Sequence, residues 1–309
     1  MMNDKAILVL GAGQLGMAVL RHLAARARQG AGVTLSVLLR AATIASSDPA
    51  KQQDLADLDA LGVRIVQGDL AALSSAELAA SFGRFDTVIS CTGFVGGPGV
   101  QRKIARAALD GGVGRFIPWQ FGVDYDVIGR GSPQDLFDEQ LDVRDMLRAQ
   151  ERTEWIIIST GMFTSFLFEP AFGVVDLAAN TVNALGSLDT AVTLTTADDI
   201  GALTADILFA EPRIVNDVVH IAGDTVTYGE IADALDRVRG VKVRRHVWTV
   251  PALKDQLAAD PDNSMRKYRA VFAEGRGVAW DQKQTFNARR GIAVCGLDQW
   301  LDDHATAFG

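Results

Sequence analysis

A glycine-rich hexapeptide near the start of the chain is the strongest chemical signal in the sequence. Residues 11–16 read Gly-Ala-Gly-Gln-Leu-Gly, a G-x-G-x-x-G spacing, and the apolar run Lys5–Leu10 precedes them. In a strand–turn–helix setting, these glycines allow a tight turn, close approach to a pyrophosphate, and close helix–strand packing. A plain glycine-rich turn is the alternative. We predict a dinucleotide site in which the contacts come from Gly11, Gly13, Gln14, Leu15 and Gly16.

The residue that follows the second predicted strand, Val33–Leu39, distinguishes a site for NAD(H) from a site for NADP(H). An NAD site usually has Asp or Glu there, bonded to the ribose 2′-hydroxyl. This chain has Arg40, and the first acid that follows is Asp48. Because a guanidinium binds phosphate bidentately, Arg40 predicts a 2′-phosphate and therefore NADP(H). A solvated surface arginine is the alternative interpretation.

Two further groups of residues follow predicted strands, where ligands of parallel sheets bind. Asp69 and Leu70 follow the third strand, and Asp69 is placed to reach the adenine edge. Thr92, Gly93 and Phe94 follow the fourth strand. We expect both groups to contact the cofactor, and a structural role is the alternative for each.

Common catalytic patterns are absent from the sequence. Short-chain dehydrogenases use a Tyr-x-x-x-Lys pair for proton transfer, but four residues after the three tyrosines stand Gly129, Ala232 and Phe272. There is no G-x-S-x-G nucleophile elbow. The four histidines have no metal-type spacing, so we expect no metal.

Short apolar runs alternate with helical patterns over the first half of the chain. The predicted strands are Lys5–Leu10, Val33–Leu39, Arg64–Gln67, Thr87–Ser90, Arg115–Pro118 and Trp155–Ser159. The predicted helices are Leu15–Ala27, Asp54–Leu61, Ala76–Phe82, Val100–Leu109 and Leu136–Arg148. A polar loop is expected at 124–131. This alternation predicts an α/β fold with a doubly wound parallel sheet of the Rossmann type.

The pattern loosens after residue 160. We therefore predict an NADP-binding Rossmann domain at 1–160 and a smaller α+β substrate lobe at 161–309, partly interleaved with the Rossmann sheet. The net charge is −8, and the sequence contains no basic run of the kind that nucleic-acid-binding proteins have. We therefore expect no nucleic-acid partner. No signal peptide or apolar membrane window is present, so we expect a cytoplasmic protein without a membrane partner. The sequence is compatible with a homodimer but does not determine the oligomeric state.

The chain resembles the isoflavone reductase-like, or NmrA-like, branch of atypical short-chain dehydrogenases, and it is similar to microbial aromatic alcohol reductases. The resemblance covers nearly the whole chain. It rests on the glycine loop, Leu39-Arg40, 68–70, the Arg-Phe-Ile-Pro-Trp-Gln-Phe-Gly segment at 115–122, Leu136–Arg148 and 159–163. It implies NADPH-dependent hydride transfer to small aromatic, phenylpropanoid-like substrates. It also implies cofactor contacts from Trp119, Gln120, Phe121 and Phe163.

One departure from the family concerns the catalytic lysine, because its position is occupied by Gln140. The side chains at 136, 140, 143 and 147 share one helix face, which is apolar except at Gln140, so we expect Gln140 to point inward. An amide can bind a substrate oxygen but cannot exchange a proton at neutral pH. A buried glutamine satisfied by backbone is the alternative. Tyr125 and Asp138 are the candidates for proton transfer.

Two functions follow from these observations. The first is an NADPH-dependent reductase whose aromatic substrate binds beside phenylalanines 163, 166, 168 and 172, although lobe core is the alternative for at least two of these. The second is a redox sensor of the NmrA type, which binds NADP(H) without turnover. The missing lysine favours the sensor, and the aromatic segment favours the reductase.

Overall fold

The computed structural model describes residues 5–94 and 96–305. These residues form two compact units, which are described separately. The first unit contains the described residues up to Gln120, together with Asp142–Ile158 and Ile200–Val218. The second contains Phe121–Leu141, Ser159–Asp199 and the described residues from Val219 onward.

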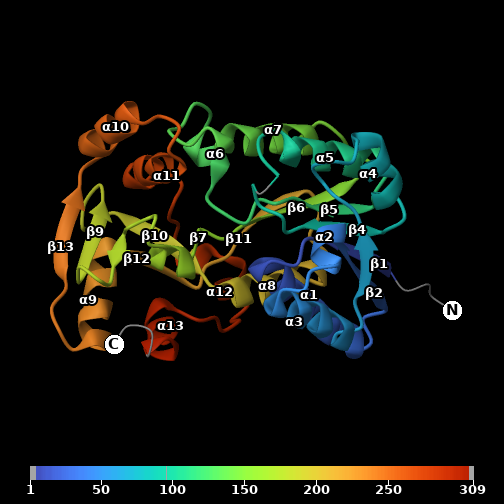
Figure 1. Cartoon of the computed structure of the whole chain (residues 1–309), viewed down its shortest axis with the longest axis horizontal. Coiled ribbons are helices and arrows are strands. Elements are labelled where there is room, and N and C mark those ends of the chain that lie inside the picture. Colours follow the sequence, from blue (N-terminus) through green and yellow to red (C-terminus); the bar gives the residue numbers. More distant parts are fainter. Residues whose placement is uncertain (1–4, 95, 306–309) are drawn as a thin grey trace. The chain divides into compact units, whose positions relative to one another are not determined.

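A parallel sheet of seven strands, counted over the described residues, organises the first unit (Figure 1). Its order is β11-β6-β5-β4-β1-β2-β3. The strands are β1 (Lys5–Leu10), β2 (Val33–Leu39), β3 (Arg64–Gln67), β4 (Thr87–Ser90), β5 (Arg115–Ile117), β6 (Glu154–Ser159) and β11 (Asp217–His220). The order reverses between β1 and β4, which is the switch point of a doubly wound sheet. The predicted Rossmann-type fold is confirmed.

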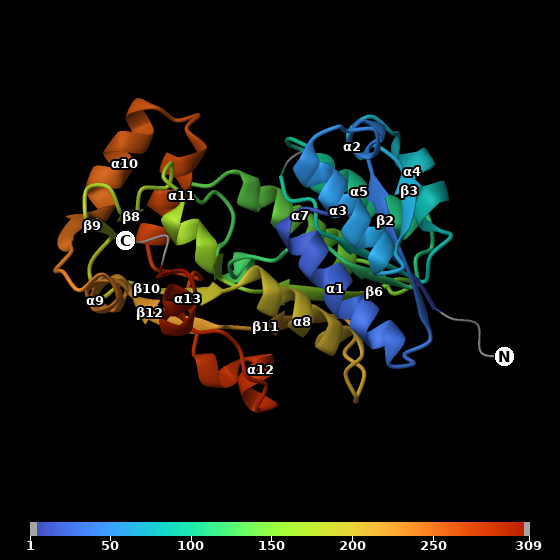
Figure 2. The same ribbon diagram turned by 60° about the horizontal axis from the view of Figure 1, so that its bottom comes forward.

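Helices cover both faces of this sheet (Figures 1 and 2). One face carries α1 (Gln14–Arg28), α3 (Pro49–Ala60) and α8 (Ala197–Leu208), and the other carries α4 (Ser75–Phe82) and α5 (Val100–Asp110). Apolar side chains of α4 and α5, such as Phe82 and Ile104, pack on Leu8, Leu10 and Val88 of the strands. Strands buried on both faces explain why their sequences are continuous apolar runs.

Helix α3 begins at Pro49 rather than at the predicted Asp54. The Asp48 carboxylate accepts hydrogen bonds from the backbone N–H of Ala50 at 2.8 Å and of Lys51 at 3.2 Å. Proline suits the first position of a helix because its missing N–H would have no partner there. The Asp-Pro pair is therefore a start signal that apolar periodicity alone does not detect. A short helix, α2 (Ala41–Ile44), precedes it.

The expected polar loop at 124–131 is partly wrong, because it contains helix α6 (Tyr125–Ile128). Asp124 caps α6 by accepting from the Val127 N–H at 3.2 Å. Helix α7 (Leu136–Arg148) has the predicted bounds. Gln140 is fully buried on it, so the inward orientation expected from helical spacing is confirmed.

Small sheets and short helices build the second unit. The sheet orders are β12-β10-β7 and β13-β9-β8. The strands are β7 (Met162–Phe163), β8 (Val175–Asp176), β9 (Thr181–Leu185), β10 (Ala191–Thr195), β12 (Asp224–Thr227) and β13 (Arg244–Trp248). The helices are η1 (Thr164–Phe168), α9 (Tyr228–Arg239), α10 (Val250–Ala259), α11 (Ser264–Ala273), η2 (Gln282–Gln284), α12 (Phe286–Arg289) and α13 (Leu297–Asp303).

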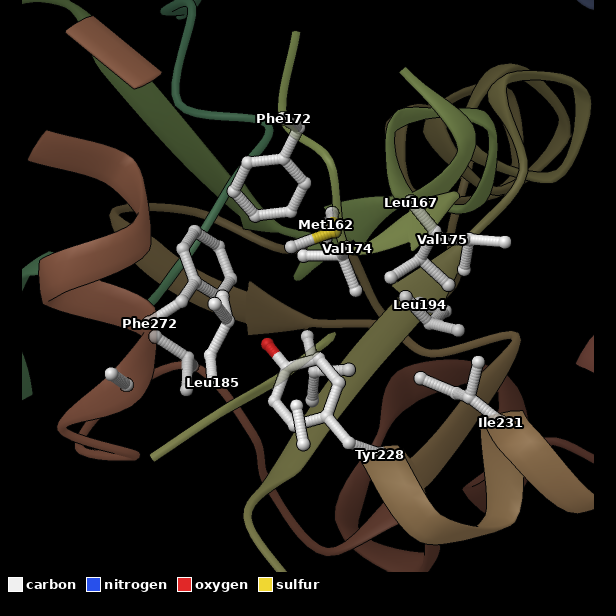
Figure 3. Close-up of a cluster of buried hydrophobic side chains, with 14 of the residues drawn as sticks. Met162, Leu167, Phe172, Val174, Val175, Leu185, Leu194, Tyr228, Ile231 and Phe272 are labelled. Atoms are coloured by element: carbon white, nitrogen blue, oxygen red, sulfur yellow. The ribbon is translucent and has the colours of Figure 1, made fainter. Parts of the chain in front are cut away.

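An apolar core fills the second unit (Figure 3). Phe172 is fully buried in it, and Phe166 and Phe168 pack against it, so most of the expected aromatic segment is core. The Tyr228 hydroxyl points into this cluster, toward Leu185 and Phe272 (Figure 3), and has no hydrogen-bond partner among the described residues. Burial raises the pKa of the Tyr228 phenol above its ordinary value.

Replacing Tyr228 with phenylalanine should leave stability unchanged or raise it by about 1–2 kcal/mol, because the change removes a desolvated hydroxyl that gains no hydrogen bond. Urea unfolding of Tyr228→Phe beside the parent measures the difference. Leu194→Ala, which opens a cavity in the same core, should cost about 2–5 kcal/mol and shows that the measurement reports this core. A loss above 1 kcal/mol for Tyr228→Phe would show a hydrogen bond that the structure does not contain.

Candidate functional site

Two glycines of the 11–16 segment disfavour a side chain, Gly11 through its positive φ and a tight contact, and Gly16 at the start of α1 through a direct clash. Gly11 has φ +88°, and a Cβ there would lie 3.0 Å from Thr92 Cγ2. A Cβ at Gly16 would lie 2.1 Å from the Gly11 carbonyl oxygen. Helix α1 therefore packs directly on the turn that precedes it, as a dinucleotide-binding turn requires.

Gly13 differs from these two glycines because it faces open space. A Cβ at Gly13 would meet nothing within 4 Å among the described atoms. Gly13 is also the N-cap of α1, and no side chain of the described residues caps this helix, whereas Asp48 caps α3 and Ser74 caps α4. The first N–H groups of α1 and its dipole are thus available to an anion such as a pyrophosphate.

A cavity of about 340 Å³ lies where β1, β2, β3 and β4 end. Its lining brings together four segments singled out in the sequence, namely the glycine turn, the end of β2, the residues after β3 and Thr92 after β4. The lining residues that bear on binding are Gly11, Ala12, Gly13, Arg40, Thr43, Lys51, Asp54, Asp69, Leu70, Cys91 and Thr92. The position at carboxyl ends beside the switch point is where dinucleotides bind in such sheets.

Two cationic side chains, Arg40 and Lys51, line the same cavity. Arg40 is exposed at the start of α2, and Lys51 comes from the first turn of α3. The Lys51 ammonium lies 3.0 Å from the Asp54 carboxylate. Lys51 was missed in the sequence because α3 was expected to start at Asp54. The Asp48-Pro49 start signal would have placed Lys51 in the first turn of the helix.

The Asp69 carboxylate holds its own loop. Asp69 Oδ1 accepts from the backbone N–H of Ala71 at 2.8 Å and of Ala72 at 3.3 Å. Asp69 and Leu70 both line the cavity. Asp69 therefore stabilises its own loop and also lies at the cavity where a cofactor contact is expected.

Beyond β4 the chain passes under the indole of Trp119. Gly93 has φ +56°, and a Cβ there would lie 3.3 Å from Trp119 Cζ2. The Gln101 side-chain amide donates to the Gly93 carbonyl and anchors this segment. Thr92 lines the cavity, while Gly93, Phe94 and Trp119 lie outside its lining.

Gln120 is fully buried, and its side chain is engaged by α7. Gln120 Oε1 accepts from Arg144 Nε at 2.9 Å, and Arg144 is also fully buried. Arg144 was not identified as a site residue from the sequence. The available signal was its place one helical turn after Gln140.

Four of the other expected residues, Tyr125, Phe121, Phe163 and Gln140, belong to the second unit. Tyr125 is buried with its ring edge-on to Phe137, at 4.9 Å between centroids. Phe121 is buried, Phe163 is half-buried, and Gln140 is fully buried. None of these four lines the cavity of the first unit.

Other chemistry at the cavity is limited. Cys91 lines it, but burial raises the pKa of its thiol, so Cys91 stays protonated at neutral pH. Over 5–94 and 96–305, no three His, Cys, Asp or Glu side chains gather as a metal site would need. Across the same residues, none of the helices has the length and apolar character needed to span a bilayer.

Comparisons with known proteins give concordant results. A model of the NmrA-like family matches residues 3–289. An NmrA-like family domain-containing oxidoreductase from Gibberella moniliformis is 49% identical, with 98% of each chain covered. Phenylcoumaran benzylic ether reductase Pyrc5 from Pyrus communis is 30% identical, covering 83% of this chain and 84% of the relative. A solved structure of AtPrR2 with NADP+ and (+)pinoresinol superposes with a TM-score of 0.77 at 19% identity, covering 98% of this chain and 99% of that one.

Alanine at Gly16 and at Gly13 should have opposite effects on stability. Gly16→Ala forces a methyl group against the Gly11 carbonyl and should lower the free energy of unfolding by about 2 kcal/mol or more. Gly13→Ala enters open space at an extended backbone position with φ −73° and ψ −170°, so it should change stability by less than about 0.5 kcal/mol. Denaturant unfolding of both variants decides this, and equal losses would contradict the packing described for the turn.

Proposed function

The chain belongs to the NmrA-like family, and we propose that it is an NADPH-dependent reductase of small aromatic molecules. The observation that carries this proposal is the cavity where an uncapped helix N-terminus and two cationic side chains, Arg40 and Lys51, line one space. Relatives with the names oxidoreductase and benzylic ether reductase support the reaction class. The solved structure with NADP+ and (+)pinoresinol supports the cofactor and the aromatic substrate class.

The residues of the cavity fit a 2′-phosphorylated dinucleotide. In this proposal, the N–H groups at the start of α1 bind the pyrophosphate above Gly13, where the absence of a Cβ leaves space. Arg40 and Lys51 bind the 2′-phosphate, Arg40 through its guanidinium fork and Lys51 as a point charge. Asp69 and Leu70 lie at the adenosine, and Thr92 at the next part of the ligand. The bound cofactor supplies the hydride.

Gln140 and Tyr125 have separate roles in the proposed reaction. The Gln140 amide binds and orients a substrate oxygen, because it has hydrogen-bond donors and an acceptor but cannot transfer a proton at neutral pH. Tyr125 is the group proposed to transfer the proton. We assign cofactor contacts to Phe121 and Phe163, and Gln120, held by Arg144, fixes the segment that contains Trp119.

A second candidate function is an NADP(H)-binding regulator without turnover. Two observations favour it: Gln140, which cannot exchange a proton, is fully buried, and Tyr125 is packed in the core of its unit. Such a protein would still bind the cofactor at Arg40 and Lys51. Turnover, rather than cofactor binding, separates the two functions.

Cofactor choice should depend on Arg40. Arg40→Ala should weaken binding of NADP+ and of adenosine 2′,5′-bisphosphate by about 10- to 100-fold, because a charge-assisted phosphate contact is lost. NAD+ binding should change by less than about threefold, since NAD+ has no 2′-phosphate. Isothermal titration of the variant and the parent measures both. Arg64→Ala, an exposed arginine outside the cavity lining, is the control, and a parent that prefers NAD+ would refute the assignment.

Turnover decides between the reductase and the regulator. The parent should oxidise NADPH only when an aromatic substrate is added, tested with benzylic ethers, conjugated aromatic carbonyls and quinones. Gly13→Ala should abolish this oxidation without unfolding, because its methyl group fills the space kept for the pyrophosphate. If NADP+ binds but no member of the panel is reduced, the regulator is correct and the reductase is not.

A further inference from the structure

A carboxylate, Asp54, lines the cavity beside the two cations that the proposed function assigns to the 2′-phosphate. Asp54 comes from α3, one turn after Lys51, and its Oδ2 lies 3.0 Å from Lys51 Nζ. The exposed fraction is 36% for the Asp54 side chain and 48% for the Lys51 side chain. The pair is therefore solvated and can exchange partners. No sequence pattern singles out Asp54, because it stands well beyond the position where acids bind the ribose of NAD.

The other carboxylate of the cavity is already engaged. Asp69 Oδ1 accepts two backbone N–H groups, of Ala71 and Ala72, and these fix it to its loop. Asp54 has an ammonium as its partner, and this ammonium is a cation that a phosphate would also bind. A 2′-phosphate carries between one and two negative charges at neutral pH, so it and Asp54 compete for the same Lys51.

We propose that Asp54 limits the preference of this cavity for a 2′-phosphate over a 2′-hydroxyl. It occupies Lys51 when no phosphate is bound, and a phosphate must displace it. An uncharged ribose hydroxyl does not need Lys51, so Asp54 does not compete with it. The chain therefore retains measurable affinity for NAD(H) relative to NADP(H), and Asp54 is the residue that sets the ratio. This inference rests on the proposed assignment of Arg40 and Lys51 to the 2′-phosphate.

The test compares Asp54→Asn with Asp57→Asn. Asp57 lies on the same helix but outside the cavity lining, and its carboxylate accepts a hydrogen bond from Gln53 Nε2 at 2.7 Å. Asp57→Asn removes the same single negative charge as Asp54→Asn and is therefore the matched control. We expect Asp54→Asn to tighten the binding of adenosine 2′,5′-bisphosphate and NADP+ by about 3- to 5-fold, from the relief of competition for Lys51. NAD+ should be unchanged or weaker. Asp57→Asn should change each dissociation constant by less than about twofold.

The same titrations in a Lys51→Ala background test the mechanism. Because competition for Lys51 is the proposed cause, most of the gain from Asp54→Asn should disappear when Lys51 is absent. A full gain in that background overturns the inference, as does an equal change for NADP+ and NAD+ or a weaker adenosine 2′,5′-bisphosphate complex in Asp54→Asn. A parent that does not bind adenosine 2′,5′-bisphosphate at all refutes the proposed function itself.

Discussion

The first unit depends on the contact between helix α1 and the turn that precedes it. Gly16 lies so close to the Gly11 carbonyl that even a methyl group cannot enter. This approach fixes the direction of α1, and with it the direction of the free N–H groups at its start. A cavity forms above these groups because the neighbouring strands end at the same edge. The close packing therefore determines where an anion can bind.

Electrostatics within that cavity result from two helix starts with different caps. Helix α1 has no side-chain cap among the described residues and so presents its N–H groups to the cavity. Helix α3 has its N–H groups satisfied by Asp48, and instead contributes the charged side chains of Lys51 and Asp54. One helix thus offers backbone donors and the other offers a cation with its competitor. This division suits a ligand with a pyrophosphate and a separate, smaller phosphate.

Apolar packing forms the core of the second unit. Its core buries Phe172, Tyr228 and Phe272 together, and Tyr125 belongs to the same cluster. The aromatic segment after β6 reads in the sequence as either a substrate pocket or core. Packing assigns Phe166, Phe168 and Phe172 to the core, whereas Phe163 lies outside this core cluster and is half-buried.

The sequence by itself determined six strands of the parallel sheet, the glycine turn and the inward orientation of Gln140, because each depends on a local period or on a backbone position that only glycine tolerates. It also predicted Arg40 as a cofactor-binding residue, because Arg40 directly follows a strand. Only the tertiary structure decided that Lys51 and Asp54 join Arg40, that Gln120 is bound by Arg144, and that Tyr125 is buried. These facts depend on contacts between segments that are separate in the chain, and no local pattern encodes such contacts.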